Sequence, residues 1–69
     1  MRELVVKPFA VENGETKFYK EIAGDSNETK PTENIIDGSI FLETDTGTVS
    51  FFSEESDDWV AQFSFQPST

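Results

Sequence analysis

Hydrophobic and polar side chains alternate along several short stretches of this chain, and a period of two predicts β-strands rather than helices. The clearest stretch is WVAQFSF at residues 59–65. Its apolar side chains fall mainly on one face: Trp59, Ala61, Phe63 and Phe65. Because proline cannot donate a hydrogen bond to a sheet, Pro67 is expected to end this strand.

Residues 1–23 are predicted to form a β-hairpin. Asn13-Gly14 lies between two β-prone runs and is the strongest short-range signal for a type I′ turn. If Glu12 and Glu15 close this turn, apolar side chains from both strands collect on one face. These side chains are Val5, Phe9, Val11, Phe18 and Ile22.

The same register creates a conflict inside the hairpin, because it sets Lys7 opposite Lys20. Like charges directly across a ladder destabilise it. We therefore expect a bulge or a register slip near Pro8. This proline has no amide hydrogen, so it also marks the first strand as an edge strand or as one that is interrupted there.

Residues 24–37 are predicted to form a loop between the hairpin and the rest of the chain. Most of this segment, GDSNETKPTENIID, has no periodicity and is rich in turn-forming residues. Ile35 and Ile36 then lead into a turn at Asp37-Gly38, which delivers the chain to its second half.

Residues 38–66 are predicted to form a three-strand meander that ends with the alternating stretch described above. Two strands at 39–44 and 48–53 are joined by Asp45-Thr46-Gly47. A three-residue loop with Gly47 in the left-handed region suits this composition.

The register of these two strands stays open on the sequence. A three-residue loop pairs Phe41 with Phe51, whereas an even-numbered loop pairs Leu42 with Phe51. The even-numbered loop gathers four apolar side chains on one face: Ile40, Leu42, Val49 and Phe51. Either register leaves Phe41 or Phe52 on a second apolar face.

These elements predict one small all-β domain over residues 1–69, with about five antiparallel strands in a meander that forms a curled sheet or a small barrel. A chain of 69 residues buries only about 60% of its unfolded surface, so the core is thin. Seven Phe, one Tyr and one Trp must supply much of it. Packing in an oligomer would add to this core.

Several kinds of chemistry are excluded by composition, because the chain has neither cysteine nor histidine. Thiolate metal sites, most zinc sites and imidazole catalysis are therefore ruled out. Asp45-Thr46-Gly47 matches the active-site triplet of aspartic proteases. Glu43 and Thr44 precede it instead of an apolar strand, so we interpret it as a turn. We expect no enzymatic activity, no catalytic residue, no cofactor and no metal site.

The net charge of −9 argues against direct binding to nucleic acid or to an anionic membrane. All five basic residues lie at or before Lys30, and eight acidic residues follow. Clustered carboxylates at 54–58 suit Ca²⁺, but their spacing matches no EF-hand loop, which favours a solvated loop. The acidic half could also dock on a basic protein surface by imitating nucleic acid.

The candidate partner-binding residues combine this acidic loop with the second aromatic face. They are Phe41, Phe52, Glu54, Glu55, Asp57 and Asp58.

The second half of the chain also resembles a motif of small proteins and fibre segments of tailed bacteriophages. That motif reads PT-(variable)-GS-x-F-x-E-x-DTG-x-x-Y-x-F-(acidic or polar loop)-W. The matching residues here are Lys30-Pro31-Thr32-Glu33, Gly38-Ser39, Phe41, Glu43, Asp45-Thr46-Gly47, Phe51-Phe52 and Trp59. The chain departs from it at Ser50, where the motif has an aromatic residue. No catalytic residue is implied by this resemblance.

The resemblance implies a virion-associated module made in the bacterial host cytoplasm. Our leading hypothesis is a structural protein of the phage particle, such as a capsid decoration, head-fibre or head–tail component, that self-associates and binds other virion proteins. The alternative is an acidic phage inhibitor of host defence or transcription, whose partner is a basic, nucleic-acid-binding host protein.

Overall fold

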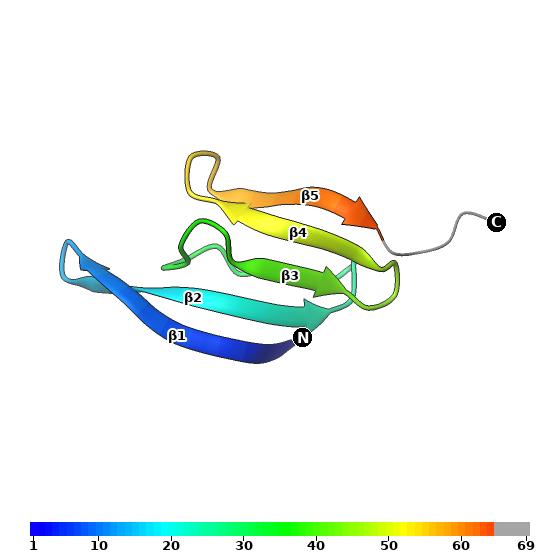
Figure 1. Cartoon of the computed structure of the whole chain (residues 1–69), viewed down its shortest axis with the longest axis horizontal. Helices are drawn as coiled ribbons and strands as arrows, with labels where there is room; N and C mark the ends of the chain where they lie inside the picture. The colour runs from blue at the N-terminus through cyan, green and yellow to red at the C-terminus, as the bar shows by residue number, and fades with distance from the viewer. Residues whose placement is uncertain (65–69) are drawn as a thin grey trace.

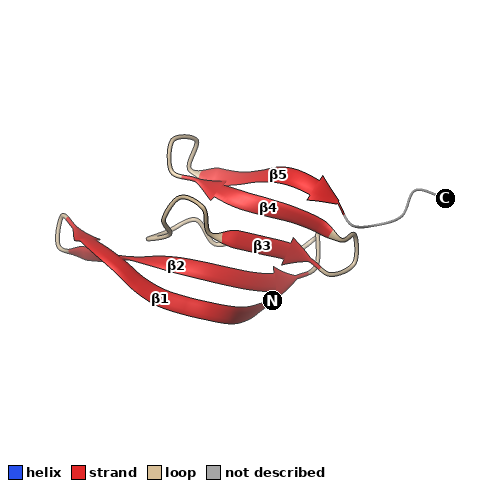
Figure 2. Cartoon of the chain, in the orientation of Figure 1, coloured by secondary structure: helices blue, strands red, loops and turns tan. Residues whose placement is uncertain are grey.

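Five strands form one sheet in the computed structural model, which describes residues 1–64 (Figures 1 and 2). In order across the sheet they are β1 (Arg2–Glu12), β2 (Glu15–Gly24), β3 (Ile40–Glu43), β4 (Thr48–Ser53) and β5 (Asp58–Ser64). The predicted all-β fold is confirmed. Residues 1–64 contain no helix, and so none long and apolar enough to span a membrane.

The hairpin of β1 and β2 turns at the predicted position. Asn13 and Gly14 have φ angles of 53° and 79°, the two positive values that a type I′ turn requires. Glu12 pairs with Glu15 across the turn. The local signal was strong enough to determine this end of the hairpin.

The predicted bulge near Pro8 is also confirmed. Pro8 pairs with Phe18 and Ala10 pairs with Lys17, which leaves Phe9 as the extra residue of β1. The shift sets Lys7 opposite Tyr19 and so removes the like-charge pair. It also splits the predicted common face: Val11, Phe18 and Ile22 stay on one side of the sheet, whereas Val5, which pairs with Glu21, moves to the other.

The predicted all-antiparallel meander is wrong at one pairing, since β2 and β3 run parallel. Glu21 pairs with Ile40 and Gly24 with Glu43. Parallel neighbours need a connection of a dozen or more residues, and residues 25–39 provide it without a helix. The sheet is mixed and open, with β1 and β5 as its edges, so it is not a barrel.

This connection, called the crossover (residues 25–39), begins to pair with β2 before β3 starts. The amide of Phe18 donates to the carbonyl of Asn34 at 2.8 Å, and the amide of Ile36 donates to the carbonyl of Phe18 at 3.0 Å. Where the chain then turns away, the buried Ser39 hydroxyl accepts the Lys20 amide at 3.1 Å. The serine hydroxyl thus gives the Lys20 amide an acceptor at the point where the crossover backbone provides none.

The crossover covers one face of the sheet, which we call the covered face. The buried apolar side chains there and in the crossover include Ile22, Ile35, Ile36, Phe41 and Phe52. Trp59 packs edge-on against the rings of Phe41 and Phe52, with centroids 5.8 and 5.2 Å away. Its indole Nε1–H donates to the carbonyl of Pro31 at 2.8 Å, which ties the crossover to the sheet.

The β3–β4 turn comprises four residues, 44–47, so of the two alternatives the even-numbered loop occurs. Gly47 has the expected positive φ, 74°, and its amide donates to the Glu43 carbonyl at 2.7 Å. Ile40 pairs with Phe51 and Leu42 with Val49. Neither predicted pairing occurs, but the grouping of these four side chains on one face is confirmed.

The alternation predicted for β5 is interrupted by a bulge. Ala61 pairs with Ser50 and Phe63 with Val49, so Gln62 is the extra residue. Phe63 therefore lies on the face opposite to Trp59 and Ala61. The predictions for Phe65 and Pro67 fall outside the described residues.

Gly24 lies where the sheet, the crossover and β1 meet. A Cβ atom there would lie 3.1 Å from the tip of the Phe41 ring, 3.1 Å from Glu28 Oε1 and 3.3 Å from the backbone of Met1. We expect Gly24→Ala to lower the free energy of unfolding by about 1–3 kcal/mol through overpacking, measured by urea denaturation. The exposed control Thr29→Ala should change it by less than about 0.5 kcal/mol. Equal effects would contradict this contact.

Glu43 is held on the covered face through both carboxylate oxygens. The Thr46 hydroxyl donates to Oε1 at 2.7 Å, and Lys30 Nζ lies 3.1 Å from Oε2 and 4.9 Å from the Phe41 ring centroid. The hydrogen bonds from Thr46 and Lys30, with the charge of Lys30, hold the pKa of Glu43 below its ordinary value of 4.5. The ionised form of Glu43 therefore stabilises the fold.

This arrangement predicts a pH-dependent effect of Glu43→Gln. A pKa that is lower in the folded state contributes stability above the unfolded value, and that contribution is lost as pH falls through the folded pKa. The stability gap between wild type and Glu43→Gln should be present at pH 7 and shrink at pH 3 in urea titrations. The exposed crossover variant Glu33→Gln should show no such change. A Glu43→Gln gap that is equal at both pH values would contradict the arrangement.

Candidate interaction surface

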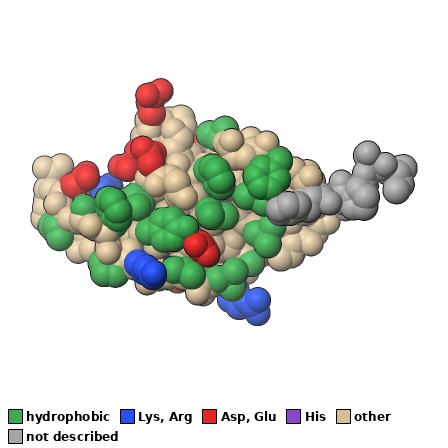
Figure 3. Space-filling model, in the orientation of Figure 1, with side chains coloured by type: hydrophobic (Ala, Val, Ile, Leu, Met, Phe, Trp, Pro, Cys, Tyr) green, Lys and Arg blue, Asp and Glu red, His purple; other side chains and the backbone are tan. Residues whose placement is uncertain are grey.

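The second face of the sheet, called the open face, carries apolar side chains that no described segment crosses. Its members are Tyr19, Ile40, Leu42, Val49, Phe51, Val60 and Phe63, which strand pairing places on one side. Phe51, Val60 and Phe63 are 37%, 45% and 50% exposed. Figure 3 shows hydrophobic side chains spread over β2 to β5 on this face. Exposed apolar side chains on one face of a small domain make that face the candidate interaction surface.

Polar groups lie on the β1–β2 side of the open face. The Tyr19 hydroxyl donates to Glu21 Oε2 at 2.7 Å. This hydrogen bond, followed by burial and the negative charge of Glu21, raises the pKa of Tyr19 above its ordinary value of 10.0. At neutral pH the tyrosine therefore remains a donor. Lys7, which pairs with Tyr19, and Lys17, which pairs with Ala10, project from the same face.

The acidic loop, residues 54–58, lies at one end of the open face between β4 and β5. It is held by a reciprocal pair, in which the Glu54 amide donates to Asp37 Oδ1 and the Asp37 amide donates to Glu54 Oε2. Asp57 takes a positive φ of 54°, and Asp58 Oδ1 accepts the Trp59 amide at 2.8 Å. The loop is therefore ordered by its own carboxylates while remaining exposed.

A groove of about 450 Å³ joins the acidic loop to the open face. Its lining combines two carboxylates with apolar and backbone surface: Asp37, Gly38, Phe51, Phe52, Ser53, Glu55, Val60 and Gln62. Such a lining complements a side chain with an aliphatic stem and a positive head. Within residues 1–64 no three acidic side chains converge as a metal site.

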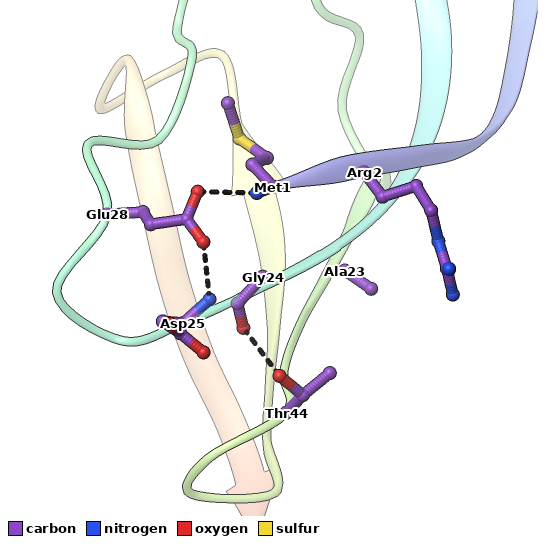
Figure 4. Close-up of a pocket in the computed structure, with 7 residues that line it drawn as sticks. All are labelled: Met1, Arg2, Ala23, Gly24, Asp25, Glu28 and Thr44. Atoms are coloured by element: carbon purple, nitrogen blue, oxygen red, sulfur yellow. Dashed lines mark hydrogen bonds and ion pairs between the residues drawn. The ribbon is translucent and has the colours of Figure 1, made fainter.

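A second groove, of about 350 Å³, lies where the start of β1 meets the start of the crossover (Figure 4). Its polar groups are engaged locally, since Glu28 Oε1 accepts the Asp25 amide at 2.9 Å and Glu28 Oε2 lies 2.7 Å from the Met1 amino nitrogen. These hydrogen bonds, the one from the Asp25 amide first, lower the pKa of Glu28 below 4.5. Because the polar groups of this groove already bond one another, we do not take it as the candidate site.

The predicted partner-binding residues separate into two groups. Glu54, Glu55, Asp57 and Asp58 are exposed together in the acidic loop, as expected of a docking surface. Phe41 and Phe52 are 0% and 3% exposed beneath the crossover, so their assignment to a contact surface is wrong. The loop prediction for residues 24–37 gave no sign that this segment would cover them. The exposed apolar side chains lie instead on the opposite face, among them Phe51 and Val60.

Asp45, from the protease-like triplet, anchors the crossover. Its carboxylate accepts the Ser26 amide at 2.9 Å and the Ser26 hydroxyl at 2.7 Å. The hydroxyl bond is the main reason that the pKa of Asp45 lies below its ordinary 3.8. The geometry supports the turn interpretation.

Comparison with known proteins gave no match: no protein-family model, no curated protein and no solved structure matches this chain.

Proposed function

We propose that this chain is a non-enzymatic protein–protein interaction module of a tailed bacteriophage particle, acting as a decoration, head-fibre or head–tail component. The observation that carries the proposal is the open face, an apolar surface on a thin sheet with the acidic loop at its end. The phage setting is supported by the motif of the second half. The module would self-associate and bind other virion proteins.

The test is the protein content of particles of the phage that encodes the chain. Mass spectrometry of gradient-purified virions should detect the chain at a fixed ratio to the major capsid protein. A Val60→Asp variant, which places a charge on the open face, should fold but be depleted from particles. Wild-type chain present in infected cells and absent from purified virions would refute the proposal.

The exposed acidic cluster favours a second candidate function, inhibition of a basic host protein. Asp37 and the four carboxylates of the acidic loop lie at one end of the molecule, and all are exposed. In this role the chain would bind a host nucleic-acid-binding protein, and duplex DNA would compete for the complex. The double variant Glu55→Gln, Asp57→Asn, which removes two negative charges from the acidic loop, should abolish the interaction. Binding that DNA does not displace would refute this candidate.

A further inference from the structure

We propose that the open face is covered by a second copy of this chain, with the two sheets face to face and the acidic loop of each copy over Lys7 and Lys17 of the other. This inference deepens the self-association part of the proposed function and rests on it. It specifies the occupant of the open face and the orientation of that occupant.

The first argument is the position of opposite charges on the open face. Glu21, Ile40, Phe51 and Val60 pair across the sheet and mark one column. Moving two residues along the strands from this column, toward the acidic loop, reaches two pairs. Lys7 and Tyr19 lie on β1 and β2, and Ser53 and Asp58 lie on β4 and β5. Lys7 and Lys17 therefore share one end of the face with the acidic loop but occupy the opposite edge. On that edge Glu21 lies in the column itself, and Glu12 and Glu15 lie beyond Lys17 at the tip of the hairpin. In Figure 3 acidic side chains lie near the β4–β5 loop, and the basic side chains lie over the β1–β2 hairpin with further acidic side chains among them.

Only one two-fold arrangement of stacked sheets brings these groups together. A two-fold axis that runs parallel to β3, midway between the sheets, places β1 of one copy over β5 of the other and β2 over β4. The two ends of one sheet then lie over the same ends of the other. The acidic loop of one copy then lies over Lys7 and Lys17 of the other. An axis perpendicular to the strands would lay the acidic loop over the apolar end around Leu42 and Phe63. Electrostatic complementarity selects the first arrangement.

The apolar centre of the face agrees with this axis. Ile40 and Leu42, on the middle strand, would meet their own copies, as a two-fold interface requires. Phe51 on β4 would lie over the β2 of the partner and Val60 on β5 over its β1. Two sheets would then pack about 10 Å apart as a β-sandwich, with this face as the shared core.

The area available predicts a moderate affinity. Five strands spaced about 4.8 Å apart and paired over about 20 Å give a flat footprint of roughly 480 Å² per copy. The accessible surface follows the side chains and so exceeds this flat footprint, which places the dimer between the smallest specific interfaces and the standard of about 800 Å² of accessible surface per partner. We expect a dissociation constant in the micromolar range.

Sedimentation equilibrium of the full chain from 5 to 500 µM tests the proposal. Wild type should shift from monomer to dimer across this range. Val60→Glu should weaken the dimer at least tenfold, because Val60 is 45% exposed on the open face. Val6→Glu is the matched control, because Val6 is 43% exposed on the other edge strand and pairs with Lys20 on the opposite side of the sheet. It adds the same charge and should leave dimerisation unchanged. Circular dichroism establishes that both variants are folded.

A charge swap tests the orientation. Lys17→Glu and Glu55→Lys should each weaken the dimer, and the double variant should restore it, since each swapped residue would again face its opposite charge in the partner. A wild type that is monomeric at 500 µM, equal effects of Val6→Glu and Val60→Glu, or no recovery in the double variant would each overturn the proposal. A dimer that is absent from virions would instead refute only the phage function, whereas a monomer found in virions would refute the dimer and the self-association but leave the virion role standing.

Discussion

Replacing Phe41 with alanine should lower the free energy of unfolding by about 3–5 kcal/mol. Phe41 is fully buried between the sheet and the crossover, where it contacts the Trp59 ring and lies under the Lys30 ammonium. A folded chain of this size has a total stability of roughly 3–10 kcal/mol, so the variant should be substantially unfolded at 37 °C. Chemical denaturation followed by circular dichroism measures this loss.

Phe9→Ala is the matched control for the loss of a phenyl ring. Phe9 is 70% exposed at the β1 bulge, so its removal should change stability by less than about 0.5 kcal/mol. Comparable losses in the two variants would mean that the crossover does not build the core described here.

Trp59→Ala should have the second largest effect, a loss of about 3 kcal/mol. The indole both packs against Phe41 and Phe52 and donates to the Pro31 carbonyl. Trp59→Phe separates these contributions. It keeps an aromatic ring on the sheet and leaves the carbonyl without that donor, so it should cost only about 1–2 kcal/mol.

Trp59 is the only tryptophan in the chain, so unfolding of these two variants must be followed by circular dichroism rather than by fluorescence. In hydrogen exchange, Trp59→Phe should speed exchange of the crossover amides, including that of Ile36, more than that of the β1–β2 ladder. Uniform acceleration across the sheet would show that the indole hydrogen bond does not hold the crossover in place.

Local chemistry determined the parts of the fold that could be predicted. Asn13-Gly14 specifies its turn because few residue pairs accept two positive φ angles. The bulge beside Pro8 followed from the cost of opposing Lys7 to Lys20. The shared face of Ile40 and Phe51 followed from the two-residue period of strands.

Long-range pairing could not be predicted in the same way. The parallel pairing of β2 with β3 depends on the path of the crossover, and that segment has no periodicity that would reveal it. Ile35 is buried because it pairs beside Phe18, a partner that no local pattern identifies. Gln62 likewise carries no signal for the bulge that moves Phe63 to the open face.

The candidate site was predicted in part for the same reason. The exposure of the acidic loop depends only on its charged composition and on its place in a turn, and both can be read from the sequence. Which aromatic face is covered depends on where the crossover lies, and so Phe41 and Phe52 were assigned to the wrong side. Their burial leaves Phe51 and Val60 as the exposed apolar side chains of the sheet on which the proposed interface rests.

The parallel pairing of β2 also has a consequence during synthesis on the ribosome. The β1–β2 hairpin is complete once Gly24 has emerged, but the backbone that pairs with the inner edge of β2 begins only at Asn34, and β3 itself at Ile40. During that interval the nascent hairpin presents a bare edge that could pair with another chain. Lys17 and Lys20 lie on this strand, and charged side chains discourage such pairing. These lysines would thus protect the unfinished chain from aggregation.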